Sequence, residues 1–209
     1  MEKLSCSNFG YRNWLLAEAI PSIAKIGYRG IEIVTHSLGW PIGYHLNPEP
    51  YIDERYVNKL METLETYKLK VVCISPSSNF YNPRTGSLKE EVKHVERHID
   101  LAVLVGAPLV RIQAGASIKT EIPRTALIEM LSDPIAECVD YARSRGVKVA
   151  IETHRGAWVS IPENMKDLLN AVRSSYLGVC LHTLPEYADR TVRILGSKII
   201  HLHHSGTTK

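Results

Sequence analysis

The sequence predicts an α/β fold in which parallel strands alternate with covering helices. Short apolar segments, most of them rich in Val and Ile, recur along the chain, as expected for strands buried on both faces. Amphipathic stretches with helical periodicity lie between them. This strict alternation with short loops is typical of a parallel sheet covered by helices. We expect either a closed barrel or an open doubly wound sheet.

The first part of the chain contains three predicted strands and two predicted helices. A strand over 3–7 leads into a helix over 14–26. The second strand, 30–35, precedes the one long irregular connection, 36–52, which is a candidate for substrate contact. A helix over 53–67 and a strand over 70–75 follow.

The rest of the chain repeats a helix–strand unit. The predicted helices are 88–105, 124–145, 161–173 and 185–195, and the predicted strands that follow them are 109–113, 148–153, 177–182 and 199–203. Four glycines stand where a left-handed residue ends a helix: Gly27, Gly106, Gly146 and Gly196. Capping boxes, each with a Glu three residues on, are predicted at Ser87, Ser160 and Thr183.

Composition limits the class of protein. The chain has 209 residues, enough for one domain over 1–209 with a full core. A formal charge of +3 without a dense Lys/Arg cluster gives no support to nucleic-acid or membrane-surface binding. No apolar run could span a bilayer, and no secretory leader is evident. Four widely separated cysteines favour a reducing compartment, so we expect a cytoplasmic protein.

Polar residues close three consecutive predicted strands. Glu152 ends Val-Lys-Val-Ala-Ile-Glu, His182 ends Gly-Val-Cys-Leu-His, and His203 ends Ile-Ile-His-Leu-His. They are spaced roughly 20 to 30 residues apart, which leaves room for one crossover helix between parallel strands. The carboxyl ends of parallel strands meet at one mouth, so the three side chains should converge. One carboxylate and two imidazoles predict a divalent-metal site.

Other polar residues are expected near this mouth. His154 shares the strand face of Glu152, and both are candidate catalytic residues; Arg155, which follows in the loop, is a candidate substrate contact. Arg111 and Gln113 share an inward face; a buried Arg needs an anion, either substrate or a carboxylate such as Glu32 or Glu152.

The remaining histidines differ in their expected roles. His36, which has the parity of Glu32, is a candidate substrate contact. His201 lies one layer deeper than His203 and is expected to be a hydrogen-bonded core residue. His94 and His98 are expected at the surface of a helix.

Motifs of other enzyme classes are missing from the sequence. No Gly-x-Gly-x-x-Gly follows the first strand and no Walker-type loop occurs, which disfavours a nucleotide-binding open sheet. No Gly-x-Ser-x-Gly elbow or Cys–His arrangement indicates nucleophilic catalysis.

Four segments, 24–33, 146–154, 177–183 and 199–204, resemble the xylose isomerase-like TIM barrels. That superfamily includes sugar and sugar-phosphate isomerases and epimerases, dehydratases and endonuclease IV. The resemblance implies a TIM barrel, here with about seven parallel strands and the eighth βα unit absent. Barrels of this kind run to roughly 250 residues. Unpaired edges of the first and seventh strands would favour a homo-oligomer.

The resemblance also implies a metal site. In the isomerases and epimerases of the family, Glu, Asp, His and Glu from four strands hold a divalent ion. Glu152 matches the first Glu, His203 matches the His, and His182 stands at the Asp position. The last Glu belongs to the eighth strand. Fewer carboxylates and more imidazole shift the preference from Mg or Mn towards Zn or Fe(II). We expect Zn, Mn, Co or Fe at Glu152, His182 and His203.

The function implied is a metal-dependent isomerase or epimerase acting on a small, carbohydrate-like hydroxy-carbonyl compound through an enediolate. A dehydratase of the superfamily begins with the same proton abstraction. The alternative is a catalytically silent barrel that serves as a binding module. An endonuclease IV-type repair enzyme ranks lower, because the run His182-Thr183-Leu184-Pro185 lacks both metal ligands of that family's Asp-Thr-x-His motif.

Overall fold

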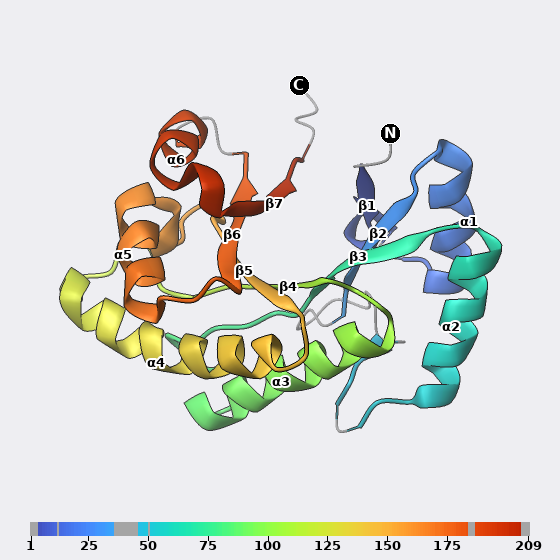
Figure 1. Cartoon of the computed structure of the whole chain (residues 1–209), viewed down its shortest axis with the longest axis horizontal. Coiled ribbons are helices and arrows are strands. Elements are labelled where there is room, and N and C mark those ends of the chain that lie inside the picture. The colour runs from blue at the N-terminus through green and yellow to red at the C-terminus, as the bar shows by residue number, and fades with distance from the viewer. Residues whose placement is uncertain (1–3, 12, 36–45, 50, 184–186, 206–209) are drawn as a thin grey trace.

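Seven parallel strands form one sheet in the computed structural model, which describes residues 4–11, 13–35, 46–49, 51–183 and 187–205. The strands are β1 (Ser5–Ser7), β2 (Gly30–Val34), β3 (Lys70–Ser75), β4 (Leu109–Ile112), β5 (Lys148–Glu152), β6 (Leu177–His182) and β7 (Ile199–His203). They are hydrogen-bonded in the order of the chain. The sheet curls on itself, so that β7 comes round towards β1 (Figure 1). The predicted α/β fold, a TIM barrel truncated to about seven parallel strands, is confirmed.

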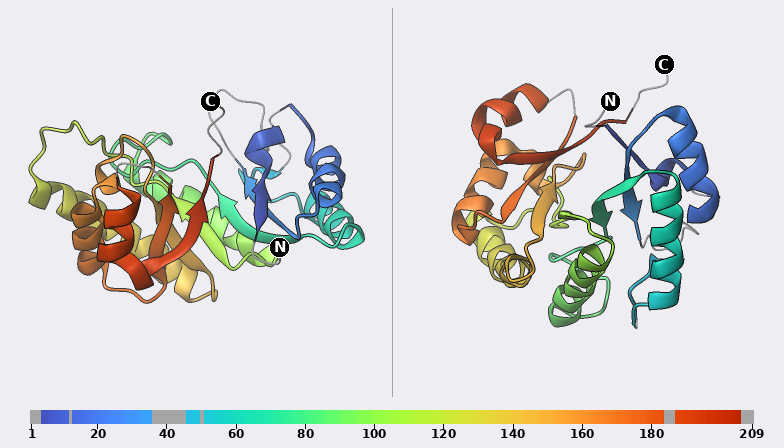
Figure 2. Two further views of the ribbon diagram at one scale, coloured as in Figure 1. Left: turned by 90° about the horizontal axis from the view of Figure 1, so that it is seen from above. Right: turned by 45° about the vertical axis from the view of Figure 1, so that its right-hand side comes forward.

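Helices cover the outer side of the curled sheet (Figures 1 and 2). They are α1 (Leu16–Ile26), α2 (Glu54–Thr66), α3 (Leu88–Leu104), α4 (Arg124–Arg143), α5 (Pro162–Val172) and α6 (Ala188–Leu195). Short 3-10 helices are η1 (Asn8–Tyr11), η3 (Trp158–Ser160) and η4 (Gly196–Lys198). No helix in the part of the chain described is long and apolar enough to cross a membrane.

Two apolar regions account for the core. The larger lies between the sheet and the helices, where β2 residues Ile31 and Ile33 join fully buried Ile20 and Ile23 of α1. A separate small cluster contains Cys73, Leu109, Ala150 and Cys180. Side chains alternate along a strand, so Ala150 and Cys180 share a face with Glu152 and His182, which end the same two strands. The small cluster therefore forms a layer beneath these polar residues.

The helix ends agree with the sequence predictions at most positions. Ser87 caps α3 by accepting a hydrogen bond from the Glu90 amide at 3.2 Å. The prediction for Ser160 is wrong, because Ile161 is the N-cap of α5 and the Ser160 hydroxyl donates to the Ala157 carbonyl in η3. The backbone of Gly196 is not left-handed. Its φ is 7°, and it is the first residue of the 3-10 helix η4. The Thr183 box includes Glu186, which lies outside the described residues.

Two shifts of register change which residues are neighbours. Between Ile31 and Glu32 the pairing of β2 with β3 shifts, so that Glu32 stands opposite Cys73. A second shift, between Val179 and Cys180, places Cys180 opposite His201 on β7. Irregularities of this kind re-aim side chains and are frequent beside functional sites. At the ends of the strand order, β1 and β7 each pair with one neighbour within the described residues.

Candidate functional site

Glu152, His182 and His203 meet at the carboxyl ends of β5, β6 and β7. Both imidazoles approach the same carboxylate oxygen: Nδ1 of His182 lies 3.2 Å and Nδ1 of His203 lies 2.8 Å from Glu152 Oε1. The three donor atoms all lie within 4.8 Å of one another. The direct pairing of His182 with His203 in the β6–β7 ladder explains why two strands present their histidines at one level.

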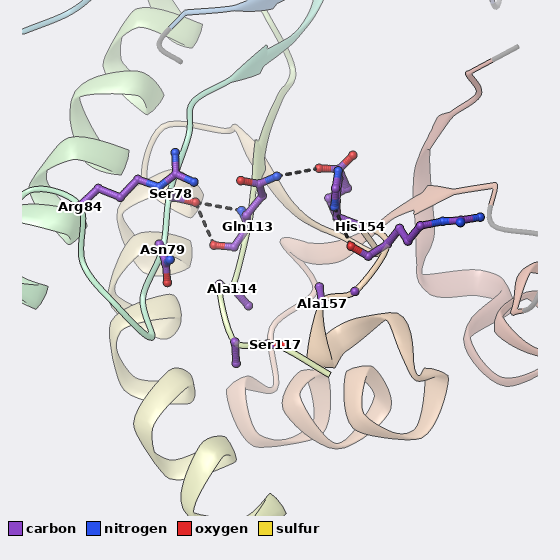
Figure 3. A pocket seen from close by; sticks show the side chains of 13 residues that line it. Ser78, Asn79, Arg84, Gln113, Ala114, Ser117, His154 and Ala157 are labelled. Carbon is purple, nitrogen blue, oxygen red and sulfur yellow. Dashed lines mark hydrogen bonds between the residues drawn. The ribbon is translucent and has the colours of Figure 1, made fainter. Parts of the chain in front are cut away.

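Glu152 is buried and its second oxygen faces cationic and amide donors. Arg111 Nη1 lies 3.5 Å from Oε2, and Gln113 Nε2 donates to the same oxygen at 3.3 Å (Figure 3). Burial alone would raise the pKa of Glu152, but the charge of Arg111 and hydrogen bonds from His182 and His203 outweigh it and hold the pKa well below its usual range. Glu152 is therefore a carboxylate whose two oxygens have different neighbours.

His203 lies between two carboxylates. Its Nδ1 donates to Glu152 Oε1 at 2.8 Å and its Nε2 donates to Glu32 Oε2 at 2.9 Å. Carboxylates only accept, so both ring nitrogens carry a proton and His203 is an imidazolium. Burial acts to lower its pKa, but hydrogen bonds with Cys180, Glu152 and Glu32 raise that pKa to about 12.

The donor set fits a divalent ion. One ligand atom each from Glu152, His182 and His203 lies within 4.8 Å of the others, and two His with one Glu is a common ligand set of catalytic zinc. An ion bound at His203 Nδ1 would take the place of the proton on that nitrogen. The hydrogen bond from His203 Nε2 to Glu32 would remain. A second ring nitrogen bonded to a carboxylate fixes the orientation of a ligating histidine.

A pocket of about 300 Å³ opens beside these residues. Glu152, Gln113 and His154 line it from the strand ends, and Arg84 and Ser117 line it from loops (Figure 3). Polar groups of both charge signs therefore surround a space large enough for a small ligand.

Two contacts hold the pocket loops together. The backbone N–H of Gln113 donates to Ser78 Oγ at 2.8 Å, while the Ser78 hydroxyl donates to the backbone carbonyl of Gln113 at 3.0 Å. Gly115 has φ of 99°, and a Cβ there would come within 1.8 Å of the Asn79 side chain. The β3–α3 and β4–α4 loops thus meet at a glycine.

The other predicted site residues have different positions. His154 lies at the exposed rim, with its ring 5.7 Å from that of His182, and Arg155 also lines the pocket. Arg111 pairs with Glu152 and does not line the pocket, which favours the ion-pair interpretation over substrate contact. His36 lies outside the described residues.

Two expectations about helix histidines were wrong. His94 and His98 of α3 are buried, not solvent-facing. His94 Nδ1 contacts the Glu49 carboxylate, and its Nε2 lies 3.0 Å from the Ser77 carbonyl. The ring therefore ties α3 to the loop after β3. Polar residues four positions apart indicate one face of a helix. This spacing does not show whether a loop covers that face.

Several pocket residues were not predicted from the sequence, namely Ser78, Asn79, Arg84 and Ser117. They lie on loops without a repeating pattern. Their position after predicted strand ends was the single available signal, and it does not distinguish them from their neighbours.

Polar side chains at the strand ends of a curled parallel sheet define the class of α/β barrels with a site at the mouth. The family model of xylose isomerase-like TIM barrels matches residues 20–209. The chain belongs to this family. No curated protein matches the sequence.

Solved structures share the fold at low sequence identity. The IOLI protein "with a binding zinc atom" is 21% identical with a TM-score of 0.78, covering 99% of this chain and 74% of its own. The probable 3-DHS dehydratase AsbF from Bacillus anthracis is 18% identical with a TM-score of 0.77, and the match covers 99% of this chain and 74% of AsbF. An L-ribulose 3-epimerase is 14% identical with a TM-score of 0.78, and the match covers 98% of this chain and 70% of the epimerase. The structural neighbours thus include a sugar epimerase and a dehydratase.

Proposed function

We propose that this protein is a metal-dependent isomerase or epimerase of a small, sugar-like hydroxy-carbonyl compound. The observation that carries the proposal is the convergence of Glu152, His182 and His203 beside a polar pocket. The epimerase and the zinc-containing structure among its structural neighbours support the same class of activity.

The mouth residues would hold a divalent ion through Glu152 Oε1 and Nδ1 of His182 and His203. With one carboxylate and two imidazoles, Zn, Co or Fe(II) is favoured over Mg. A bound ion supplies Lewis-acid polarisation of the substrate carbonyl and acidifies the neighbouring carbon. Arg111 and Gln113 keep Glu152 ionised and oriented from its other oxygen.

His154 is the proposed base. Its Nδ1 lies 3.0 Å from the Arg155 carbonyl, which can only accept, so Nδ1 carries the proton. In its neutral form the ring then has its lone pair at Nε2. A neutral imidazole at the pocket rim can take the proton from a carbon next to the carbonyl and return it on the same face to the neighbouring carbon, whereas epimerisation needs a second group that delivers a proton to the opposite face. Such transfer through an enediolate accounts for isomerisation and, with that second group, for epimerisation.

Substrate hydroxyls would be held by Gln113 and Arg155, which line the pocket. The pocket holds amide, hydroxyl and guanidinium groups, which suit a ligand with several oxygen atoms. Dehydration requires the same first proton abstraction, so a β-hydroxy-carbonyl substrate with a good leaving group would give a dehydratase.

The test is exchange of a carbon-bound substrate hydrogen with solvent deuterium. A panel of ketoses, aldoses and related hydroxy-carbonyl compounds is assayed with added Zn, Mn or Co. His154→Asn should lower exchange by about 100-fold or more, while Glu163→Gln on the outer helix α5 serves as the control and should leave it unchanged. No exchange and no turnover across the panel would refute the proposal.

One observation favours a catalytically silent binding module. Glu32 and Glu152 carry negative charge, and Arg111 and His203 carry positive charge, so these four charges balance one another. A buried charge network that is already satisfied does not require an ion. The deuterium test above separates the two functions.

A further inference from the structure

We propose a second cation site in the layer beneath the mouth, formed by Glu32, Cys73 and His201. Its three donor atoms, a carboxylate oxygen, a thiol sulfur and an imidazole nitrogen, all lie within 4.8 Å of one another. None of these residues belongs to the triad of Glu152, His182 and His203. The two triads are therefore separate potential ligand sets, one above the other.

The register of the sheet brings the deeper residues together. The shift between Ile31 and Glu32 places Glu32 of β2 directly opposite Cys73 of β3. The shift between Val179 and Cys180 sets His201 of β7 against Cys180. Because the sheet curls, His201 then reaches across the interior, and its Nε2 donates to Glu32 Oε2 at 2.9 Å. Both irregularities in the ladders thus occur at strands that supply the deeper site.

The surroundings hold the carboxylate in a ligating orientation. Ser75 Oγ donates to Glu32 Oε1 at 2.5 Å, while both His201 and His203 approach Oε2. Glu32 and Cys73 are buried, and the His201 side chain is 16% exposed. His201 is therefore the most exposed member of this ligand set.

The donor types select the cation. Thiolate and imidazole prefer Zn and similar borderline-soft ions to Mg or Ca. Donors around tetrahedral zinc lie about 2.0–2.3 Å from the ion, so rotation of side chains already within 4.8 Å of one another suffices to close the set. Binding would release the Cys73 thiol proton to solvent. The dication would face two anionic donors, the Cys73 thiolate and the Glu32 carboxylate, of which Glu32 is shared with His203.

His203 connects the two sites. Its Nδ1 faces Glu152 at the mouth, and its Nε2 faces Glu32 in the layer below. The Glu32 carboxylate therefore belongs to the deeper ligand set and also orients a histidine of the upper one. Occupation of the deeper site would leave the donor atoms of Glu152 and His182 free for the mouth.

Cobalt loading of the full chain tests the site. The purified protein is stripped with chelator and titrated with Co²⁺, and both metal content and near-ultraviolet absorption are recorded. We expect two Co²⁺ per chain and a thiolate-to-cobalt charge-transfer band. Cys73→Ser should remove the band and one ion, whereas Cys138→Ser, a buried cysteine of helix α4, should keep both.

Three further variants make the result unambiguous. His201→Gln should weaken Co²⁺ binding at the band-forming site, and circular dichroism should confirm that it and Cys73→Ser remain folded. Should Cys73→Ser fail to fold, His201→Gln carries the test alone. Cys180→Ser should keep the band. Glu152→Gln should lose the other ion but keep the band, so failure of the mouth site is distinguishable from failure of the deeper one.

Two results would overturn the inference. One is a wild-type protein that binds Co²⁺ without any thiolate band. The other is a band that survives in Cys73→Ser and disappears in Cys180→Ser.

Discussion

His203 of the last strand donates a hydrogen bond to Glu32 of the second strand, with 2.9 Å between Nε2 and Oε2. The two residues are 171 positions apart in the sequence and meet because the sheet curls. Glu32 is held as an anion: burial acts to raise its pKa, but hydrogen bonds from His201 and His203 outweigh burial and lower the pKa well below its ordinary value. This pair links the mouth of the barrel to the layer beneath it.

Glu32→Gln should weaken metal binding at the mouth. The amide cannot accept as strongly from His203 Nε2, so the ring loses the partner that fixes its orientation. Loss of such a partner typically costs about 10–100-fold in metal affinity. Chelator competition with Zn²⁺ measures the change in a Cys73→Ser background, which removes the deeper site that also uses Glu32, with exposed Glu90→Gln as the control. Unchanged affinity in Glu32→Gln would show that His203 is oriented by other contacts.

The stability of the chelator-treated protein should depend on pH in two opposite ways. The pKa of His203 is raised from 6.5 to about 12, so its contribution is complete below pH 6.5 and is lost as pH rises towards 12. The pKa values of Glu32 and Glu152 are lowered from 4.5, so their contributions are present above pH 4.5 and lost as pH falls. Melting temperature should be highest between about pH 4.5 and 6.5.

The decline between about pH 6.5 and 9 belongs to His203, because the buried thiols of Cys73, Cys138 and Cys180, whose pKa values are raised from 9.0 by burial, contribute only at higher pH. His203→Gln should lower the melting temperature most near pH 6 and flatten its decline at alkaline pH. A wild-type melting temperature that rises steadily from pH 6.5 to 10 would contradict the imidazolium assignment.

Gly115→Ala should destabilise the fold and distort the pocket. Both Gly115 and Gly86 have positive φ, 99° and 95°, but only at Gly115 would a Cβ collide with a neighbour, the Asn79 side chain. The strain common to both costs about 1–3 kcal/mol, and the collision adds to it at Gly115 alone. Urea unfolding of the two alanine variants separates the terms. Equal losses would mean that Asn79 moves away without cost.

We expect these 209 residues to form a homo-oligomer, most simply a dimer. β1 and β7 are edge strands, and apolar side chains are exposed beside them: Leu4 is 56%, Ile200 is 36% and Leu202 is 53% exposed. Unpaired edges and apolar surface favour association. Light scattering should show the dimer for wild type and a shift to monomer for Leu202→Lys. Val103→Lys on α3, at a similarly exposed apolar position, is the control. A wild-type monomer would refute the expectation.

Much of this architecture can be predicted from sequence, because its signals are local. Most of the seven strand segments are apolar, and those in the middle of the sheet are largely buried, whereas the edge strands β1 and β7 are only partly buried. Helical periodicity locates the six helices. Strand-end position alone predicted that Glu152, His182 and His203 would lie together, and they do. The metal they are expected to hold stays a prediction.

What the sequence alone determined is therefore the order and type of elements and which polar residues end neighbouring strands. The tertiary structure decided which side chains contact one another. Local patterns cannot predict a register shift, yet shifts set Glu32 against Cys73 and His201 against Cys180. Nor can they show that a loop covers His94, or that Arg111 pairs with Glu152. These contacts join residues far apart in the chain, and the curvature of the sheet brings them within bonding distance.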